Sequence, residues 1–226
     1  SNVSELVGRA LLPTHPGGSM ARILITSGPT RQYIDPVRYL TNASSGRMGC
    51  ALAKAALAHG HDVVVVSGPV EVEYPPDAQV VPVVSTEEML DVAQREFARC
   101  DGLIGVAAPS DYRPVLVSPQ KIKKTGEPLV LHLEETPDVV ATLGAAKRSD
   151  QWVVGFALET EDIRFRALAK METKSCDLMV LNGPQAMNAQ ENSVEVMHPN
   201  GQIIAEISGN KDDVAMGIFE IVEREL

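Results

Sequence analysis

Hydrophobic residues recur along this chain in two patterns: short apolar runs, and longer stretches with an apolar residue at every third or fourth position. The short runs predict buried strands at residues 22–26, 62–67, 80–84, 102–108, 152–157 and 177–181. The longer stretches predict helices at residues 48–59, 86–97, 137–147 and 161–174, and a last helix around Val214, Ile218 and Val222. This alternation predicts an α/β fold, a three-layer, Rossmann-like αβα arrangement around a mostly parallel sheet.

Three further patterns complete the predicted organisation. Residues 193–198 and 202–207 alternate apolar and polar positions around Pro199-Asn200-Gly201, which predicts an added β-hairpin. A polar, lysine-rich section at residues 110–126 breaks the rhythm, with a short strand expected at 129–133, and Thr86 and Thr136 are the expected helix caps. Residues 13–19 have the composition of a linker, so we interpret residues 1–19 as a linker or appended tail and residues 20–226 as one domain.

Composition excludes several classes of function. The net charge of −10 argues against a broad nucleic-acid surface, so cations that hold phosphates must be clustered locally. No apolar run reaches the roughly 18 residues that span a bilayer, and the first residues lack a signal-peptide pattern, so no membrane partner is expected. Three widely spaced cysteines, Cys50, Cys100 and Cys176, are expected to be buried free thiols, which fits a reducing cytoplasm.

The segment at residues 28–49 is unusually long and polar for a connection between a strand and its helix, which usually takes about two to six residues. Glycines and hydroxyls before a helix expose backbone N–H groups to an anion, and the Ser44-Ser45-Gly46 turn fits this role. Arg38 and Asn42 lie four positions apart, where both side chains could face a carboxylate or oxyanion. The segment has neither of the common phosphate-loop spacings, so a purely structural turn is the alternative.

Later loops carry further candidate residues. Asp111 follows the strand at 102–108 and could accept a hydrogen bond from a ring amino group, or simply cap a turn. Lys121-Ile122-Lys123-Lys124 reads either as a mobile lid that brings cations to a polyphosphate or as a solvated charge run. Lys170 and Lys174 share one helix face, toward phosphates or toward water. The five histidines show no spacing typical of a metal site or a catalytic triad.

These loops together suggest a nucleoside triphosphate and an anionic co-substrate, with no evident covalent nucleophile or metal cage. Activation of a carboxylate by nucleotidyl transfer fits such a site, with a divalent ion on the phosphates. One alternative is an NAD(P)-binding oxidoreductase of the Rossmann type, but the glycine fingerprint is missing and Ser67-Gly68-Pro69 stands where a ribose-binding acid is expected. Another alternative is a phosphometabolite-binding module without turnover, which no residue pattern favours.

The order of the motifs resembles one enzyme family. ITSGPTRQYIDPVRYLTNASSGRMG, VVVVSGPV, APSDYRP, PQKIKK, TPDVV, VVGFALET and the pair of lysines spaced by three residues are similar to 4′-phosphopantothenoylcysteine synthetase of the bacterial type. The resemblance covers residues 20–226. In many species this enzyme is the second half of a bifunctional coenzyme A biosynthesis flavoprotein.

The resemblance implies a ligation in two steps. The carboxylate of 4′-phosphopantothenate attacks the α-phosphate of CTP to give an acyl-cytidylate and pyrophosphate, and the amino group of cysteine then displaces CMP. It also implies a homodimer partly built by the hairpin strands, Mg²⁺ held through the nucleotide phosphates, no dedicated metal ligands in the protein, a fused or separate phosphopantothenoylcysteine decarboxylase as partner, and no FMN in this portion.

The resemblance also assigns residues to roles. Asn42 and Lys121 would be catalytic, with Lys121 on a flap that engages CTP. The substrate side would comprise Arg38, Asn42, Ser44, Ser45 and Gly46. The nucleotide side would comprise Gly105, Val106, Ala107, Asp111, Lys121, Pro137, Asp138, Val139, Val140, Phe156, Lys170 and Lys174. Departures from the family pattern at Pro109, Ser110, Leu158 and Gly183 leave the preference for CTP over ATP open.

Overall fold

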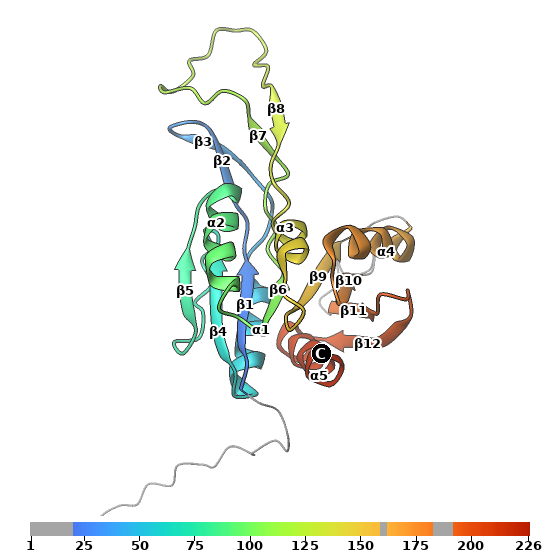
Figure 1. Cartoon of the computed structure of the whole chain (residues 1–226). Helices are drawn as coiled ribbons and strands as arrows, with labels where there is room; N and C mark the ends of the chain where they lie inside the picture. Colours follow the sequence, from blue (N-terminus) through green and yellow to red (C-terminus); the bar gives the residue numbers. More distant parts are fainter. Residues whose placement is uncertain (1–19, 159–161, 183–191) are drawn as a thin grey trace, which may run out of the picture.

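A computed structural model gives the fold and describes residues 20–158, 162–182 and 192–226. Its centre is an eight-stranded sheet in which every neighbouring pair is parallel except the two at one edge, β10–β11 and β11–β12. The sheet confirms the predicted fold class (Figure 1). Across the sheet the strands are β12 (Ile203–Gly209), β11 (Asn192–Met197), β10 (Leu178–Asn182), β9 (Trp152–Leu158), β6 (Gly102–Gly105), β1 (Arg22–Ser27), β4 (Asp62–Ser67) and β5 (Gln79–Pro82).

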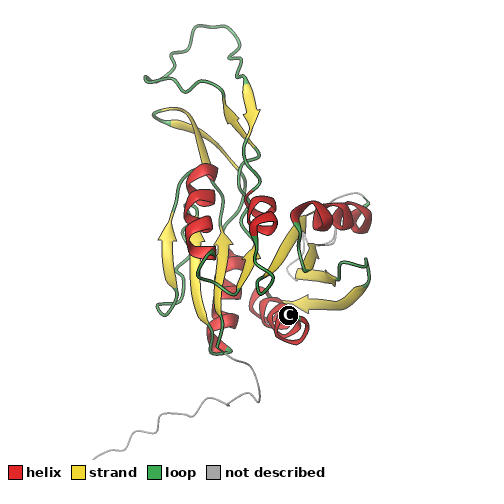
Figure 2. Cartoon of the chain, viewed as in Figure 1, coloured by secondary structure: helices red, strands yellow, loops and turns green. Residues whose placement is uncertain are grey.

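Helices cover both faces of the sheet, so the core has two layers (Figure 2). Alternate residues of β1 enter opposite layers, since Ile23 and Ile25 pack with α1 and α5 while Leu24 packs with α2, α3 and α4. Strands buried on both faces read as continuous apolar runs, which is why the sequence pattern located them well. The helices are α1 (Arg47–Ala58), α2 (Thr86–Phe97), α3 (Val139–Ala146), α4 (Ile163–Lys174) and α5 (Lys211–Glu225).

The expected irregular segment at residues 28–49 is in part a β-hairpin, which corrects the sequence prediction. It consists of β2 (Arg31–Asp35) and β3 (Arg38–Thr41), which pair antiparallel and form a small sheet of their own. Tyr33 and Tyr39 face each other across the hairpin, with ring centroids 5.3 Å apart. The connection between β1 and α1 is long because it contains this hairpin.

A second antiparallel pair forms the base of a projecting arm, residues 112–135 (Figure 1). The pair consists of β7 (Tyr112–Pro114) and β8 (Leu133–Glu135). The strand expected at 129–133 is therefore misplaced, because regular pairing begins only at Leu133. The strand expected at 102–108 also ends early, at Gly105, after which Ala108 forms an isolated bridge with Pro29.

Two helix starts differ from the prediction. Ser85, not Thr86, caps α2 in a reciprocal capping box with Glu88. Asp138, not Thr136, caps α3 by accepting a hydrogen bond from the backbone N–H of Ala141. The hydroxyls of Thr86 and Thr136 both donate to the carbonyl of Ser110. Ser85 and Asp138 therefore serve as the N-caps.

The hairpin predicted near the C-terminus is confirmed, because β11 and β12 pair antiparallel at the sheet edge. Gly201 lies in its connection with a φ of 81°, a left-handed conformation that favours glycine. Predictions for residues 1–19, Glu161 and Gly183 fall outside the described residues. Within the described residues, no helix combines the length and hydrophobicity needed to span a membrane.

The three cysteines are buried free thiols, as predicted. Burial raises the pKa of Cys100 to about 11 and the pKa of Cys176 to about 12, so both stay protonated at neutral pH. Burial also raises the pKa of Cys50. Since the thiolate is the reactive form, these cysteines contribute to packing.

Candidate active site

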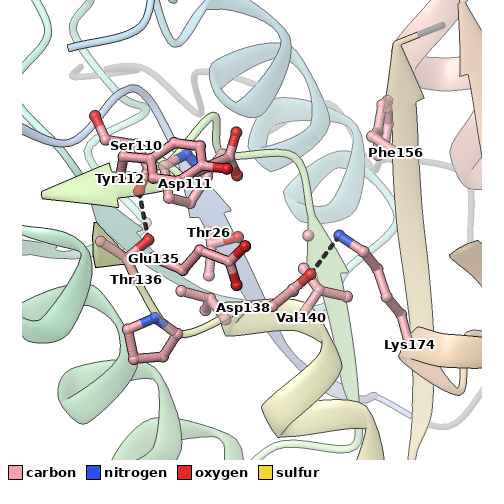
Figure 3. Close-up of a pocket in the computed structure, with 15 residues that line it drawn as sticks. Thr26, Ser110, Asp111, Tyr112, Glu135, Thr136, Asp138, Val140, Phe156 and Lys174 are labelled. Atoms are coloured by element: carbon pink, nitrogen blue, oxygen red, sulfur yellow. Dashed lines mark hydrogen bonds and ion pairs between the residues drawn. The ribbon is translucent and has the colours of Figure 1, made fainter. Parts of the chain in front are cut away.

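A cavity of about 300 Å³ lies at the carboxyl ends of the parallel strands β1, β6 and β9. Open α/β sheets bind their ligands at this edge, where loops of neighbouring strands diverge. Figure 3 shows the lining side chains, which come from strand ends, the start of α3 and the end of α4. The predicted nucleotide residues in this lining are Gly105, Ala107, Asp111, Pro137, Asp138, Val139, Val140, Phe156 and Lys174.

The start of α3 forms one wall of the cavity because β6 ends in a glycine. A Cβ atom on Gly105 would lie 2.5 Å from Cγ2 of Val140, so only glycine allows this approach. The first N–H groups of a helix have no partner within the helix, and they attract anions. Lys174 Nζ lies 3.0 Å from Asp138 Oδ2, which places a cation at the same wall (Figure 3).

Threonine hydroxyls hold the turn that carries Asp111 through the backbone of Ser110. The backbone N–H of Ser110 donates to Thr30 Oγ1 over 2.8 Å. The carbonyl of Ser110 accepts from Thr136 Oγ1 at 2.6 Å (Figure 3). It also accepts from Thr86 Oγ1 at 3.2 Å. A hydrogen bond between the hydroxyls of Thr30 and Thr86 completes this threonine cluster. The sequence analysis missed the cluster because its members come from separate loops.

Asn42 lies beside the cavity rather than in its lining. Its Nδ2 donates to the carbonyl oxygens of Pro109, at 2.9 Å, and Ala108, at 3.3 Å. Pro109 itself lines the cavity, so Asn42 is held against the loop that forms the cavity edge. The structure thus places the predicted catalytic amide at the edge of the cavity that most of the predicted nucleotide residues line.

The Ser44-Ser45-Gly46 turn, predicted to bind an anion, leads directly into α1. Gly46 is the N-cap of this helix with a φ of 73°, and no side chain caps its first turn. Ser44 and Ser45 precede it, so two hydroxyls adjoin the first turn of α1, whose backbone N–H groups have no partner within the helix. Gly49 allows α1 to approach β1, since a Cβ there would lie 2.1 Å from Ser27 Oγ.

Arg38 and Lys121 lie away from the cavity lining, at the outer end of the β2–β3 hairpin and on the arm. Arg38 Nη2 donates to the carbonyl of Ile122 at 2.7 Å, and the side chain of Lys121 is exposed. Arg38 is the first residue of β3 and Asn42 follows its last, so their backbones lie about 13 Å apart at the usual rise per strand residue. Val106 and Lys170, two of the predicted nucleotide residues, are also outside the lining.

The described residues contain no group of three or more histidine, cysteine, aspartate or glutamate side chains placed to hold a metal ion. His59 Nδ1 and His61 Nε2 instead contact the carboxylate of Glu223 in α5, at 2.6 and 2.9 Å. None of these three residues lines the cavity. Burial alone would raise the pKa of Glu223, and these two contacts hold it below its usual range.

Comparison with known proteins identifies the family. The model of the DNA/pantothenate metabolism flavoprotein C-terminal domain, DFP, matches residues 19–226. The chain belongs to the DFP family. This result confirms the resemblance seen in the motifs.

Two curated relatives of the DFP chain carry the name coenzyme A biosynthesis bifunctional protein CoaBC. The protein of Vibrio vulnificus strain YJ016 is 41% identical over 186 residues, which are 80% of this chain and 46% of the relative. The protein of Haemophilus influenzae is 37% identical over 205 residues, which are 89% of this chain and 51% of the relative. The chain therefore spans about half the length of these relatives.

A solved structure supports the same relationship. The crystal structure of the C-terminal domain of CoaBC matches this DFP chain with a TM-score of 0.78 and 36% sequence identity. The match covers 90% of this chain and 94% of that domain. The chain thus corresponds to one whole domain of the bifunctional relatives.

Proposed function

We propose that this chain is a phosphopantothenate–cysteine ligase of coenzyme A biosynthesis that uses CTP. The observation that carries the proposal is its match to nearly the whole C-terminal domain of CoaBC at 36% identity. The cavity supports it, because nine of the twelve residues that the resemblance assigns to the nucleotide line it, from five separate parts of the chain. The family and its relatives give the oxidoreductase alternative no support.

The proposed reaction needs charge neutralisation and positioning more than covalent catalysis. The substrate carboxylate attacks the α-phosphate of CTP, a P–O bond forms, and pyrophosphate leaves. The nitrogen of cysteine then attacks the acyl carbon, the C–O bond to CMP breaks, and the amine loses a proton. Lys174 and the first N–H groups of α3 suit the triphosphate, whereas the uncapped start of α1 suits the phosphate of phosphopantothenate.

Mg²⁺ bound through the nucleotide phosphates would offset their negative charge when it is present. The lining could add a carboxylate oxygen, such as one of Asp111, to the phosphate oxygens that hold this ion. Among the described residues no group of three side chains could bind the ion without the nucleotide. Within this proposal the cytoplasm is the site of action, and a decarboxylase, fused or separate, supplies the following step. Three free cysteines fit that reducing compartment.

A pyrophosphate-release assay tests the proposed function. With 4′-phosphopantothenate, Mg²⁺ and CTP, we expect pyrophosphate before cysteine is added, and CMP plus the amide product afterwards. ATP, GTP and UTP, each assayed in place of CTP, measure nucleotide preference. Release of no pyrophosphate with any of the four nucleotides would contradict the ligase, and binding without turnover would favour a binding module instead.

We also propose that the chain forms a homodimer and that the arm supplies much of its interface. The arm exposes a row of large apolar side chains, with Leu116 84% and Val130 72% exposed. Val115, Val117 and Leu129 are exposed beside them on a projection that stands away from the rest of the chain (Figure 1). Apolar patches of this kind typically mark interaction sites. The hairpin β11–β12 remains the alternative interface from the sequence.

Leu116→Asp combined with Val130→Asp is expected to convert the dimer to a monomer, because two charges would have to be buried in the interface. Sedimentation velocity at several protein concentrations measures the change. A double variant that remains dimeric, with the wild-type dissociation constant, would contradict the arm interface and favour the β11–β12 hairpin.

A further inference from the structure

The lysine loop, residues 118–126 of the arm, contacts the outer turn of the β2–β3 hairpin at two points. The backbone N–H of Ser118 donates to the carbonyl of Ile34 at 3.0 Å. Both backbone polar groups of Ile122 are also engaged by this turn. These contacts flank Lys121 on either side, so they fix the backbone that carries the predicted flap lysine.

Asp35 is the centre of the second contact. Its side chain is fully buried. Oδ1 accepts the backbone N–H groups of Val37 and Arg38, both at 2.9 Å, and so closes the turn between β2 and β3. Oδ2 accepts the backbone N–H of Ile122 at 3.1 Å, from a residue 87 positions later in the chain.

Arg38 completes the arrangement from the other side. Its Nη2 lies 3.4 Å from Asp35 Oδ2 and donates to the carbonyl of Ile122 at 2.7 Å. One carboxylate and one guanidinium thus hold the N–H and the C=O of the same residue. Such paired, charge-assisted contacts fix the position and orientation of both peptide units that flank Ile122.

The donors around Asp35 keep it ionised. Burial alone would raise the pKa of Asp35, but the backbone N–H groups of Val37, Ile122 and Arg38, with the nearby guanidinium, hold it below its usual range. The carboxylate is therefore charged at neutral pH and can accept all of these hydrogen bonds. The motif analysis gave Asp35 no role, although it lies in the segment that carries Arg38 and Asn42.

We propose that Asp35 is a positioning residue that, with Arg38, holds the lysine loop so that Lys121 is presented in one orientation for the ligation. This inference rests on the proposed function for its catalytic consequence, but the contact itself can be tested without substrate. Asp35 touches neither the nucleotide cavity nor Asn42, so it would act only through the loop.

Asp35→Asn separates the two roles of the carboxylate, which closes the turn between β2 and β3 and binds the lysine loop. The amide oxygen can still accept from Val37 and Arg38 and keep the turn closed. The amide nitrogen would then face the N–H of Ile122, where two donors meet and no hydrogen bond forms. We expect trypsin to cleave after Lys123 or Lys124 about tenfold faster in the ligand-free variant, since a charge-assisted hydrogen bond to the loop is lost.

Ile122→Pro tests the same contact from the loop side, because proline removes the donated N–H while Asp35 stays in place. It should also accelerate cleavage after Lys123 or Lys124. Asp101→Asn is the matched control. Asp101 Oδ2 likewise accepts a backbone N–H, from Arg22 at 2.7 Å, but at the far end of β1, so loop cleavage should keep the wild-type rate.

A double-mutant cycle measures the catalytic consequence. Asp35→Asn alone should lower kcat/KM about tenfold, and should change it less than about twofold when Lys121 is already Ala, because coupled residues are not additive. Equal losses in both backgrounds, or unchanged loop cleavage in Asp35→Asn and Ile122→Pro, would overturn the proposal. If the wild-type chain has no ligase activity while Asp35→Asn is cleaved faster, the proposed function fails and the loop contact is supported.

Discussion

Asn42→Ala is expected to lower the rate of amide formation by about 10²- to 10³-fold, the usual cost of removing one preorganised polar group from a reacting centre. Two carbonyl oxygens hold the side-chain nitrogen of Asn42 at the cavity edge, so the amide is fixed before substrate binds. Among the described residues its oxygen has no hydrogen-bond partner, which leaves it available to the acyl-cytidylate or the incoming amine.

The same variant should bind CTP with nearly the wild-type affinity, because Asn42 is not part of the cavity lining. Calorimetric titration with CTP and a quenched assay of the amide product separate the two effects. Asn200→Ala is the matched control, since Asn200 is an exposed asparagine in the connection between β11 and β12. Full product formation by Asn42→Ala would remove Asn42 from the mechanism even if the family assignment holds.

The sheet could be predicted from the sequence because its strands are short apolar runs buried on both faces. Ile23, Leu24 and Ile25 are at most 1% exposed, and the valines at 63–66 at most 3%. No helix with one polar face would have three or four consecutive apolar residues that all face the core. A strand buried on both faces is thus a continuous apolar run, which can be recognised from its own sequence alone.

The β2–β3 hairpin escaped prediction because its stability comes from residues far along the chain. Its polar composition indicates a loop, yet Asp35 is satisfied by Ile122, and Arg31 donates its N–H to the carbonyl of Val84. Local propensity contains no trace of such contacts, since it counts only neighbours in sequence.

The candidate site was predictable to the extent that its residues follow strand ends. Asp111 and Phe156 come together because parallel strands end at one edge of the sheet, and Lys174 joins them from the end of α4. The threonine cluster and Asp35 could not be found in this way, because hydrogen bonds between side chains and distant backbone have no periodic signature. The threonine cluster and Asp35 hold the loops that carry Asp111 and Lys121. The residues that the sequence analysis missed therefore support the predicted site residues.

Lys121→Ala is expected to lower kcat/KM for CTP about 10- to 100-fold, the cost of losing one charge-assisted hydrogen bond to a phosphate. The lysine loop is anchored on both sides of this residue while the side chain itself is exposed. Lys123→Ala is the matched control, because Lys123 is an exposed lysine of the same loop that no motif assigns to catalysis. Steady-state pyrophosphate release measures both variants, and equal losses would show a general charge effect in place of a specific role.

Mixing the Asn42→Ala and Lys121→Ala variants tests how Lys121 reaches the nucleotide. In the single chain Lys121 does not line the cavity. Asn42→Ala and Lys121→Ala are each expected to retain at most about a tenth of the wild-type activity. If the lysine loop of one protomer serves the cavity of its partner, the mixed dimer contains one site with both wild-type residues, and activity returns toward a quarter of the wild-type value. If the loop folds onto its own cavity, every site in a mixed dimer lacks one residue and activity stays low. Either result locates Lys121, whereas full activity of Lys121→Ala alone would remove it from the reaction.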